Sequence, residues 1–428
     1  MRPVDVMADL EARGLVHDST DLDALRERLS SRPVVAYYGC DPTADSFHIG
    51  HLVGILVLRR LQAAGHRPIA LAGGATGMVG DPTGRSTERV LLDEEELARN
   101  LAGIRAQLER LLDVPGSERP LLVDNATWTR DLPLLEFLRD VGRHAPVSVM
   151  LARESVKARL ESGGLTFTEF AYPLIQAHDY LVLHREHDCE LQIGGSDQWG
   201  NITAGVDLVR RVTGDAVHAF TWPLVLRSDG RKFSKSEDDN VWLSAERTSP
   251  YAFYQYWLNV PDADVRRFLL QLTLLPVEEA HAVADASEAD PAARIGQRRL
   301  ARELTDLVHG PAATAAAEAA SAVVFGADVD DVAPEALALL DGELATTAVA
   351  AARLAGGLEV VPLLAEVGLA PSRGEARRRL EQGGVYVNNR RLEAGSPAIG
   401  PGDVRGGRYV LLGLGRKRHH LLRVDGDA

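Results

Sequence analysis

One stretch of the chain, residues 34–61, constrains the fold more than any other. An apolar run over 34–38 predicts a short buried strand that stops at Gly39, and a turn rich in Asp, Pro and Thr follows it. A helix is predicted from near His48 through Leu61, where the sequence becomes apolar again. A strand, a tight turn and a helix N-terminus form a ready site for a phosphate group, because free N–H groups and the positive helix end face the ligand. The stretch therefore predicts an α/β fold with an anion site at its first turn.

The alternation of strand and helix continues well beyond this stretch. Further strands are predicted over 67–74, 120–124, 189–194 and 220–226, and further helices over about 93–112 and through much of 127–187. Strands and helices that alternate at this spacing indicate a parallel sheet with helices on both faces. We therefore expect an α/β domain over 1–240 with a helical insertion at about 127–187.

The second half of the chain lacks this regular alternation of strands and helices. Residues 241–335 predict an α-helical domain and 356–428 predict a small α+β domain. Between them, 336–355 predict a linker at the end of the Ala-rich and acidic stretch 311–355. This last domain is basic, because 371–428 hold 12 Arg and Lys but only 6 Asp and Glu, whereas the whole chain has a net charge of −14. An acidic body with a basic tail indicates a protein that presents one face to nucleic acid.

Other features argue against several protein classes. Cys40 and Cys189 lie far apart without a CxxC pattern, so we expect neither a disulfide framework nor a zinc knuckle. No apolar run approaches the ~18 residues of a membrane helix. The early acidic residues Asp5, Asp9 and Glu11 do not fit a signal peptide. We therefore expect a cytoplasmic protein with no membrane partner.

His48 and His51 lie three residues apart on one face of the predicted helix start. They could be plain polar residues there, and zinc binding by an H-x-x-H pair lacks a third ligand cluster. The remaining interpretation is two imidazole donors beside a phosphate as charge develops on it. Gly50 and Gly54 favour it, because glycines spaced four apart in a helix leave a flat strip for a planar base. Close helix–strand packing explains Gly54 nearly as well.

A second motif lies in the loop 227–238, which contains Lys232 and Lys235 among Ser, Gly and Asp residues. Such a loop is either simply solvated or a flap that closes over a bound polyphosphate. Either motif alone is weak evidence. Together, in this order on an alternating α/β pattern, they are strong evidence for a nucleotide site.

These motifs resemble those of a known family. His48-Ile49-Gly50-His51 and Lys232-Phe233-Ser234-Lys235-Ser236 look like the HIGH and KMSKS signatures of class I aminoacyl-tRNA synthetases. Stretches similar to the bacterial-type tyrosyl-tRNA synthetases cover nearly the whole chain, among them 37–43, 73–77 with 80–81, and 194–201. Phe233 replaces the Met of the general signature and Ser234 replaces the Gly of many tyrosyl enzymes, but neither change removes a lysine.

The resemblance implies a Rossmann-like catalytic domain in which ATP activates L-tyrosine and the tyrosyl group passes to the terminal ribose of tRNA(Tyr). Mg²⁺ is expected as part of the ATP substrate complex, with no metal held by the protein. The alternatives are a tryptophanyl-tRNA synthetase, which shares the catalytic fold, and a non-catalytic RNA-binding or amino-acid-sensing relative.

The resemblance also implies roles for individual residues. Those expected to stabilise the reacting phosphates are Thr43, His48, His51, Arg85, Arg89, Lys232 and Lys235. Those expected to bind ATP are Gly39, Asp41, His48, Gly50, His51, Gly195, Asp197 and Lys235. Those expected to bind tyrosine are Tyr37 and Asp179 at the phenol hydroxyl, Asp81, Tyr172 and Gln176 at the amino group, and Gln198. Taken singly, Tyr172 and Gln176 could be helix-packing residues and Asp179 a surface charge.

The basic tail, 356–424, resembles a small RNA-binding module shared with a ribosomal small-subunit protein. Its cations, expected to contact RNA phosphates, are Arg377, Arg378, Arg379, Arg390, Arg391, Arg416 and Lys417. A solvated charged helix is the alternative for the arginine triplet. The resemblance further implies that the helical domain lies on the anticodon side and that the insertion carries the contact of a homodimer.

Overall fold

The structure is a computed structural model, and it describes residues 5–81, 93–153, 156–157, 159–160, 164–226, 240–393, 395 and 398–426. The chain forms two compact units. The first unit contains Met1–Ser244 and Pro261–Gly296, and the second contains Ala245–Val260 and Gln297–Ala428.

The first unit is built on a five-stranded parallel sheet with the strand order β3-β2-β1-β4-β5. The strands are β1 (Val35–Cys40), β2 (Arg67–Ala72), β3 (Leu121–Asp124), β4 (Cys189–Gly195) and β5 (His218–Trp222). The chain passes from β1 to β2 on one side of β1 and later adds β4 on the other side, so the strand order reverses between β1 and β4. This sheet confirms the predicted α/β fold. The reversal opens a crevice outside the carboxyl ends of β1 and β4.

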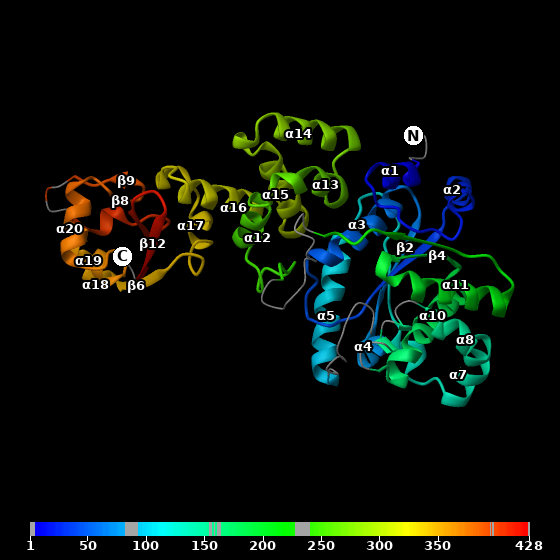
Figure 1. The fold of residues 1–428 in the computed structure, drawn as a ribbon. Coiled ribbons are helices and arrows are strands. Elements are labelled where there is room, and N and C mark those ends of the chain that lie inside the picture. Colours follow the sequence, from blue (N-terminus) through cyan, green and yellow to red (C-terminus); the bar gives the residue numbers. More distant parts are fainter. Residues whose placement is uncertain are drawn as a thin grey trace. The chain divides into compact units, whose positions relative to one another are not determined.

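Helices cover both faces of this sheet (Figure 1). On one face α3 (Ile49–Ala63) packs against β1 and β2, and α5 (Glu94–Leu111) packs against β2 and α3. On the other, α10 (Phe167–His187) and α11 (Trp199–Thr213) pack against each other and against β4. Because successive strand side chains point to opposite faces, Tyr37 packs in the core with α10 and α11, whereas the next residue, Tyr38, lies against Gly54 of α3.

Other helices of this unit are α1 (Val6–Ala12), α2 (Leu22–Ser31), α4 (Gly74–Val79), α6 (Ala126–Thr129), α7 (Leu134–Asp140), α8 (Val147–Leu151), α13 (Asp262–Leu272) and α14 (Val277–Ala289). Local sequence explains where the long helices begin. His48 caps α3, Asp93 caps α5, and Thr166 forms a capping box with Glu169 at the start of α10. Each cap satisfies N–H groups that the first helical turn leaves without partners.

Residues 261–296 pack within the first unit, so the helical domain expected from the sequence is divided between the two units. The guanidinium of Arg13 donates to the carbonyl of Leu275 at 2.7 Å, and that of Arg60 on α3 donates to the carbonyl of Thr273. Both arginines are buried. The boundary differs from the expected one because these contacts join residues far apart in the chain, which local patterns do not reveal.

The second unit combines helices with a mixed five-stranded sheet in the order β6-β12-β11-β8-β9. Its strands are β6 (Thr346–Ala350), β8 (Val385–Val387), β9 (Arg390–Arg391), β11 (Tyr409–Leu414) and β12 (Arg418–Asp425), with β7 (Leu358–Glu359) and β10 (Ala398–Ile399) as a separate pair. Its helices include α12 (Pro250–Leu258), α15 (Ile295–His309), α16 (Pro311–Val324), α17 (Pro334–Ala338), α18 (Ala351–Ala355), α19 (Val360–Glu366) and α20 (Arg373–Glu381). The predicted C-terminal α+β module is confirmed.

The segment 336–355, expected to be a linker, differs from that expectation. Its strand β6 pairs with β12, and Val349 on β6 is buried in the same core as Leu422 on β12. A second core joins Tyr251 of α12 to Leu411 of β11. The Ala-rich sequence hides the strand because the pairing partner of β6 lies at the other end of the module.

Candidate active site

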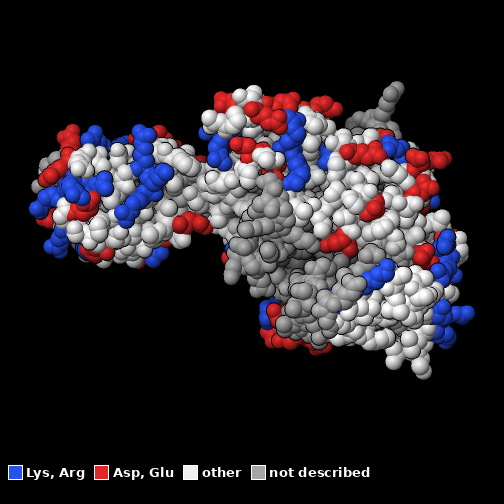
Figure 2. Space-filling model, viewed as in Figure 1, with Lys and Arg blue, Asp and Glu red and all other residues white. Residues whose placement is uncertain are grey.

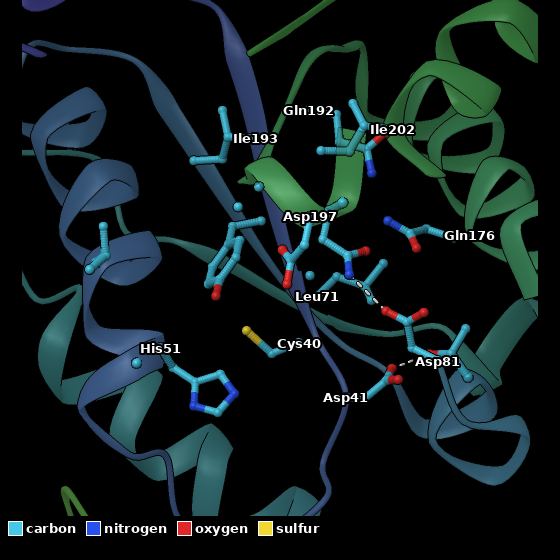
Figure 3. Close-up of a pocket in the computed structure, with 18 of the residues that line it drawn as sticks. Cys40, Asp41, His51, Leu71, Asp81, Gln176, Gln192, Ile193, Asp197 and Ile202 are labelled. Atoms are coloured by element: carbon cyan, nitrogen blue, oxygen red, sulfur yellow. Dashed lines mark hydrogen bonds between the residues drawn. The ribbon is translucent and has the colours of Figure 1, made fainter. Parts of the chain in front are cut away.

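A cavity of about 310 Å³ opens where the carboxyl ends of β1 and β4 meet (Figure 3). The predicted site residues that line it are Tyr37, Gly39, Asp41, Thr43, His48, Gly50, His51, Asp81, Tyr172, Gln176, Asp179, Gly195, Asp197 and Gln198. They come from β1 and the turn after it, from the start of α3, from α10, from the segment after α4, and from β4 with the 3-10 turn Ser196–Gln198. The other predicted residues, Arg85, Arg89, Lys232 and Lys235, lie outside the residues that the structure describes.

Tyr37 and Asp179 both line the cavity, and both are 2% exposed. The hydroxyl of Tyr37 has no hydrogen-bond partner among the described residues. Burial raises the pKa of Tyr37 well above its ordinary value, and the nearby Asp179 carboxylate raises it further. A buried polar atom without a partner is costly, so this hydroxyl is available to a ligand with a polar group of its own.

Two donors hold the carboxylate of Asp179, and neither was predicted from the sequence. Nε1 of Trp128 donates to Oδ1 at 2.9 Å, and Nδ2 of Asn125 donates to Oδ2 at 3.0 Å. Burial raises the pKa of Asp179 to about 7, although both hydrogen bonds oppose that shift. The only sequence signal for this pair was position, because polar residues that directly follow a strand of a parallel sheet lie at its ligand-binding edge. Asp179 is therefore a buried group and not a surface charge.

Asp41 and Asp81 form the centre of a second polar cluster in the cavity (Figure 3). The hydroxyl of Tyr172 donates to Oδ2 of Asp41 at 2.9 Å, and the hydroxyl of Thr76 donates to Oδ1 at 2.7 Å. Nε2 of Gln198 donates to Oδ2 of Asp81 at 2.7 Å. Burial raises the pKa of Tyr172 well above its ordinary value, and the Asp41 and Asp81 carboxylates add to the shift. Carboxylates fixed in this way suit a cationic group of a ligand.

His48 and His51 line the cavity from the start of α3. The backbone N–H of Gly50 donates to Nδ1 of His48 at 3.0 Å, and the backbone N–H of His48 donates to Nδ1 of His51 at 3.4 Å. Burial lowers the pKa of His48 to about 4, so this imidazole is neutral at pH 7. Because its Nδ1 accepts a hydrogen bond, the proton of the neutral ring resides on Nε2. His48 is thus both the helix cap and an uncharged N–H donor.

Gly50 and Gly54 serve different purposes in the structure. A Cβ on Gly54 would lie 2.4 Å from Cζ of Tyr38, so the Tyr38 ring fills the space beside this glycine. The packing interpretation of Gly54 therefore holds, and no flat strip for a base remains there. Gly50 lines the cavity, where a Cβ would lie 2.8 Å from Cε1 of His48. The Tyr38 ring also lines the cavity and meets Trp222 edge-on at 5.5 Å, a pair that sequence reasoning missed.

The described part of the chain contains neither a cluster of metal ligands nor a helix that could cross a membrane. Within it, no group of three or more His, Cys, Asp or Glu residues is placed to hold a metal ion. None of the helices described there combines the length and the apolar composition that crossing a membrane requires.

The predicted RNA-contacting cations all lie on the surface of the second unit, where Figure 2 shows Lys and Arg side chains gathered around the α20 region. Several of them are paired with carboxylates. Arg379 pairs with Glu375 at 2.9 Å, and Arg378 pairs with the same carboxylate. Arg390 pairs with Asp328 at 3.0 Å. The arginine triplet is therefore partly neutralised within its own helix.

Apolar side chains are exposed on the helical insertion of the first unit. The largest exposed fractions belong to Leu134 (70%), Leu135 (79%), Val147 (59%) and Phe167 (78%).

Two family models match the chain and together span most of it. The model for class I tRNA synthetases (W and Y) matches residues 29–326. The model for the tyrosine–tRNA ligase SYY-like C-terminal domain matches residues 343–422. The match thus covers both the unit with the cavity and the basic module.

Curated relatives and solved structures agree with these models. The chain is 49% identical over 422 residues to the tyrosine–tRNA ligase of Opitutus terrae, covering 98% of this chain and 99% of the relative. It is 46% identical to that of Rhodopirellula baltica, with coverage of 98% and 96%. A C-terminally truncated mitochondrial tyrosyl-tRNA synthetase of Aspergillus nidulans has a similar structure, with a TM-score of 0.68, 34% identity and coverage of 75% of this chain and 94% of that one.

Proposed function

The chain belongs to the class I tRNA synthetase family of tryptophan and tyrosine enzymes, and we propose that the cavity between β1 and β4 is where it joins tyrosine to AMP. The enzyme is a tyrosine–tRNA ligase (EC 6.1.1.1). It activates L-tyrosine with ATP and then transfers the tyrosyl group to the terminal ribose of tRNA(Tyr) for protein synthesis. Such a role belongs in the cytoplasm.

The observation that carries the assignment of the amino acid is the pair of Tyr37 and Asp179. A tyrosine side chain entering this end of the cavity donates its phenol O–H to Asp179, and its oxygen accepts from the Tyr37 hydroxyl, which has no partner among the described residues. Phenylalanine would leave both buried groups without partners, and a site built to bind a hydroxyl rejects an analogue that lacks it. (Selection of tyrosine over phenylalanine is a well-known instance of this rule.)

The ammonium group of tyrosine binds at Asp81, Tyr172 and Gln176, and Asp41, assigned to the ATP side, lies beside them through its hydrogen bond with Tyr172. Two carboxylates held by hydrogen bonds offset the positive charge. This places the tyrosine carboxylate toward the middle of the cavity. There Gln198 and Asp197 border the reacting groups, and Asp197 accepts from a ribose hydroxyl of ATP.

The first reaction needs no nucleophile from the protein. An oxygen of the tyrosine carboxylate attacks the α-phosphorus of ATP in line, a P–O bond forms, and pyrophosphate leaves as the bond to the β-phosphate oxygen breaks. The second reaction breaks the mixed anhydride when a ribose hydroxyl of tRNA attacks the tyrosyl carbonyl, and AMP leaves. Catalysis consists of positioning and of stabilising charge on the phosphates.

The His48 end supplies donors for those phosphates. His48 offers its Nε2–H without a positive charge of its own, and Thr43 and His51 line the same end. Arg85, Arg89, Lys232 and Lys235 are proposed to complete this wall with cationic side chains. The KMSKS-like motif supports the two lysines, and the wider resemblance to the family supports the two arginines of the polar loop. Mg²⁺ enters as part of the ATP substrate complex.

Amino-acid-dependent exchange of pyrophosphate into ATP tests the assignment. We expect tyrosine to stimulate exchange and tryptophan and phenylalanine not to do so. Stimulation by tryptophan would support the tryptophanyl alternative instead. Absence of exchange with every amino acid, in protein with an intact melting transition, would support a non-catalytic relative.

The basic module is proposed to bind tRNA(Tyr) through backbone phosphates. Truncation cannot test this proposal cleanly, because β6 and the shared core join the module to α12, α16 and α17. Charge reversal is the better experiment. We expect Arg377→Glu with Arg416→Glu to weaken tRNA charging and to lower its salt dependence, while exchange stays normal. Unchanged charging would contradict the proposal.

The exposed apolar side chains of the insertion are proposed to form the interface of a homodimer. Leu135 on α7 is 79% exposed in the isolated chain, so a charge there costs little within one subunit. We expect Leu135→Glu to shift the protein from dimer to monomer in sedimentation equilibrium. A wild-type protein that is monomeric at micromolar concentration would contradict the proposal.

A further inference from the structure

Gln192 on β4 has a buried polar atom that the scaffold does not use. The residue is 2% exposed, and its Oε1 has no hydrogen-bond partner among the described residues. Its side chain is one of those that line the cavity (Figure 3). A buried amide with an unsatisfied end is unfavourable in a folded protein unless something else fills the need.

The sheet register places Gln192 beside Tyr37. The two residues are partners in the parallel pairing of β1 and β4, so their side chains leave the same face of the sheet from adjacent strands. The Tyr37 hydroxyl and the Gln192 amide therefore lie side by side near Asp179. The hydroxyl of Tyr37 and Oε1 of Gln192 both have no hydrogen-bond partner among the described residues.

Helix α11 leaves room for this amide. Gly205 faces it, and a Cβ at that position would lie 3.1 Å from Oε1 of Gln192 and 3.0 Å from Cδ1 of Tyr180. A glycine inside a helix lowers helix stability, so its presence here fits a need for space. A side chain at this position would press on the amide, so the glycine keeps its space clear. The two ends of an amide are nearly equal in size, and a half-turn about its last bond puts the N–H₂ end where Oε1 lies.

A phenol hydroxyl has hydrogen-bonding capacity for three neighbours, one as donor and two as acceptor. In the proposed function Asp179 takes the donor and Tyr37 fills one acceptor position. We propose that Gln192 is a specificity-determining residue that fills the second, by donating an amide N–H to the phenol oxygen of bound tyrosine. This inference rests on the proposed function, since it deepens the choice of amino acid at the same cavity.

An unpartnered glutamine oxygen alone would not support the inference. Gln62 on α3 is 1% exposed, and its Oε1 also has no partner among the described residues. Its Nε2 donates to the carbonyl of Glu118 at 2.9 Å, and it does not line the cavity. Gln192 differs because its amide faces the space where the ligand binds.

Gln62 therefore provides the matched control. We compare Gln192→Met and Gln62→Met, which both remove a buried amide at nearly constant volume, in tyrosine- and phenylalanine-dependent pyrophosphate exchange. For Gln192→Met we expect kcat/KM with tyrosine to fall about tenfold, mostly through KM, and that with phenylalanine to change little. The ratio of kcat/KM for tyrosine to kcat/KM for phenylalanine should therefore fall about tenfold. For Gln62→Met the ratio should keep its wild-type value.

An unchanged tyrosine-to-phenylalanine ratio in folded Gln192→Met would overturn the inference. If that variant does not fold, Gln192→Asn retains a polar amide but withdraws it from the ligand, and the same fall in the ratio is expected. Wild-type exchange distinguishes the two levels of argument. If the wild-type protein shows no exchange with tyrosine, the proposed function itself is refuted. If the wild-type protein exchanges normally and the Gln192 variants keep its tyrosine-to-phenylalanine ratio, only the role of Gln192 is refuted.

Discussion

The indole Nε1 of Trp128 donates a hydrogen bond to Oδ1 of Asp179 across 2.9 Å. Trp128 lies in the α6 turn after β3, whereas Asp179 lies in the middle of α10. This hydrogen bond and the one from Asn125 fix the carboxylate in a site that otherwise disfavours its charge. In the proposed function, the selectivity of the cavity therefore depends on residues that need not touch the substrate.

Trp128→Phe keeps the aromatic ring but removes the donor. Losing a hydrogen bond to a charged group costs roughly 1.5–3 kcal/mol. We therefore expect the KM for tyrosine in pyrophosphate exchange to rise by roughly tenfold or more, with little change in the KM for ATP. Trp257→Phe, in the second unit, serves as the control and should leave both constants unchanged. A normal KM for tyrosine in Trp128→Phe would show that Asn125 alone positions Asp179.

Asp179 should also make stability depend on pH. Burial raises its pKa to about 7, above the value near 4 that it has in an unfolded chain. The folded protein therefore binds more protons than the unfolded one between these values, so the contribution to stability is full below about pH 4 and is lost as the pH rises through about 7. The free energy of unfolding of wild type minus that of Asp179→Asn should fall from about pH 4.5 to about pH 7.5. A difference that stays constant in urea titrations would refute the raised pKa.

His48 combines a structural and a chemical role, and two substitutions separate them. Asparagine is a good helix cap, so His48→Asn should keep most of the stability, whereas His48→Ala should lose about 1 kcal/mol. Both variants lack the Nε2–H donor, and we expect both to slow adenylate formation by roughly a hundredfold in single-turnover kinetics. If asparagine restored the rate as well as the stability, His48 would be a cap and nothing more.

Because the pKa of His48 is about 4, the wild-type rate should show no titration of this group above about pH 5.5.

Gly54 should be intolerant of a side chain because the ring of Tyr38 occupies the space. A Cβ there would approach Cζ of Tyr38 to 2.4 Å, so the ring must move toward the cavity that it lines. We expect Gly54→Ala to lower the free energy of unfolding by roughly 1–3 kcal/mol and to raise the KM for ATP more than that for tyrosine. Tyr38→Leu in the same chain should recover part of the lost stability. Purely additive effects in this double-mutant cycle would contradict the packing argument.

Much of the fold could be predicted because its signals are local. The apolar run before Gly39 and the periodic helix after His48 each depend on a few neighbouring residues, and the parallel sheet followed from their alternation. The part of the cavity wall at the start of α3 could be predicted for the same reason, since the turn and the helix start are contiguous in sequence. A prediction that depended on composition alone was wrong: the Ala-rich segment that contains strand β6 was expected to be a linker.

The residues that sequence reasoning missed have a common property. Asn125, Trp128 and Gln192 acquire their roles from a partner on another element: Asp179 for the first two, and Tyr37 for the third. Tyr38 likewise matters because of Gly54, which lies on the following helix. No periodicity or motif records such a pairing.

The sequence by itself determined the strands and the long helices of the first unit, and which side chains stand at the ends of β1 and β4. These outcomes follow from patterns within one or two turns of chain. Only the tertiary structure decided which buried polar groups are satisfied and which remain for a ligand. That distinction depends on distances of a few ångströms between residues far apart in the chain, such as the 2.9 Å from Trp128 to Asp179. Only the structure shows, for this reason, that the hydroxyl of Tyr37 and Oε1 of Gln192 are buried without a hydrogen-bond partner among the described residues.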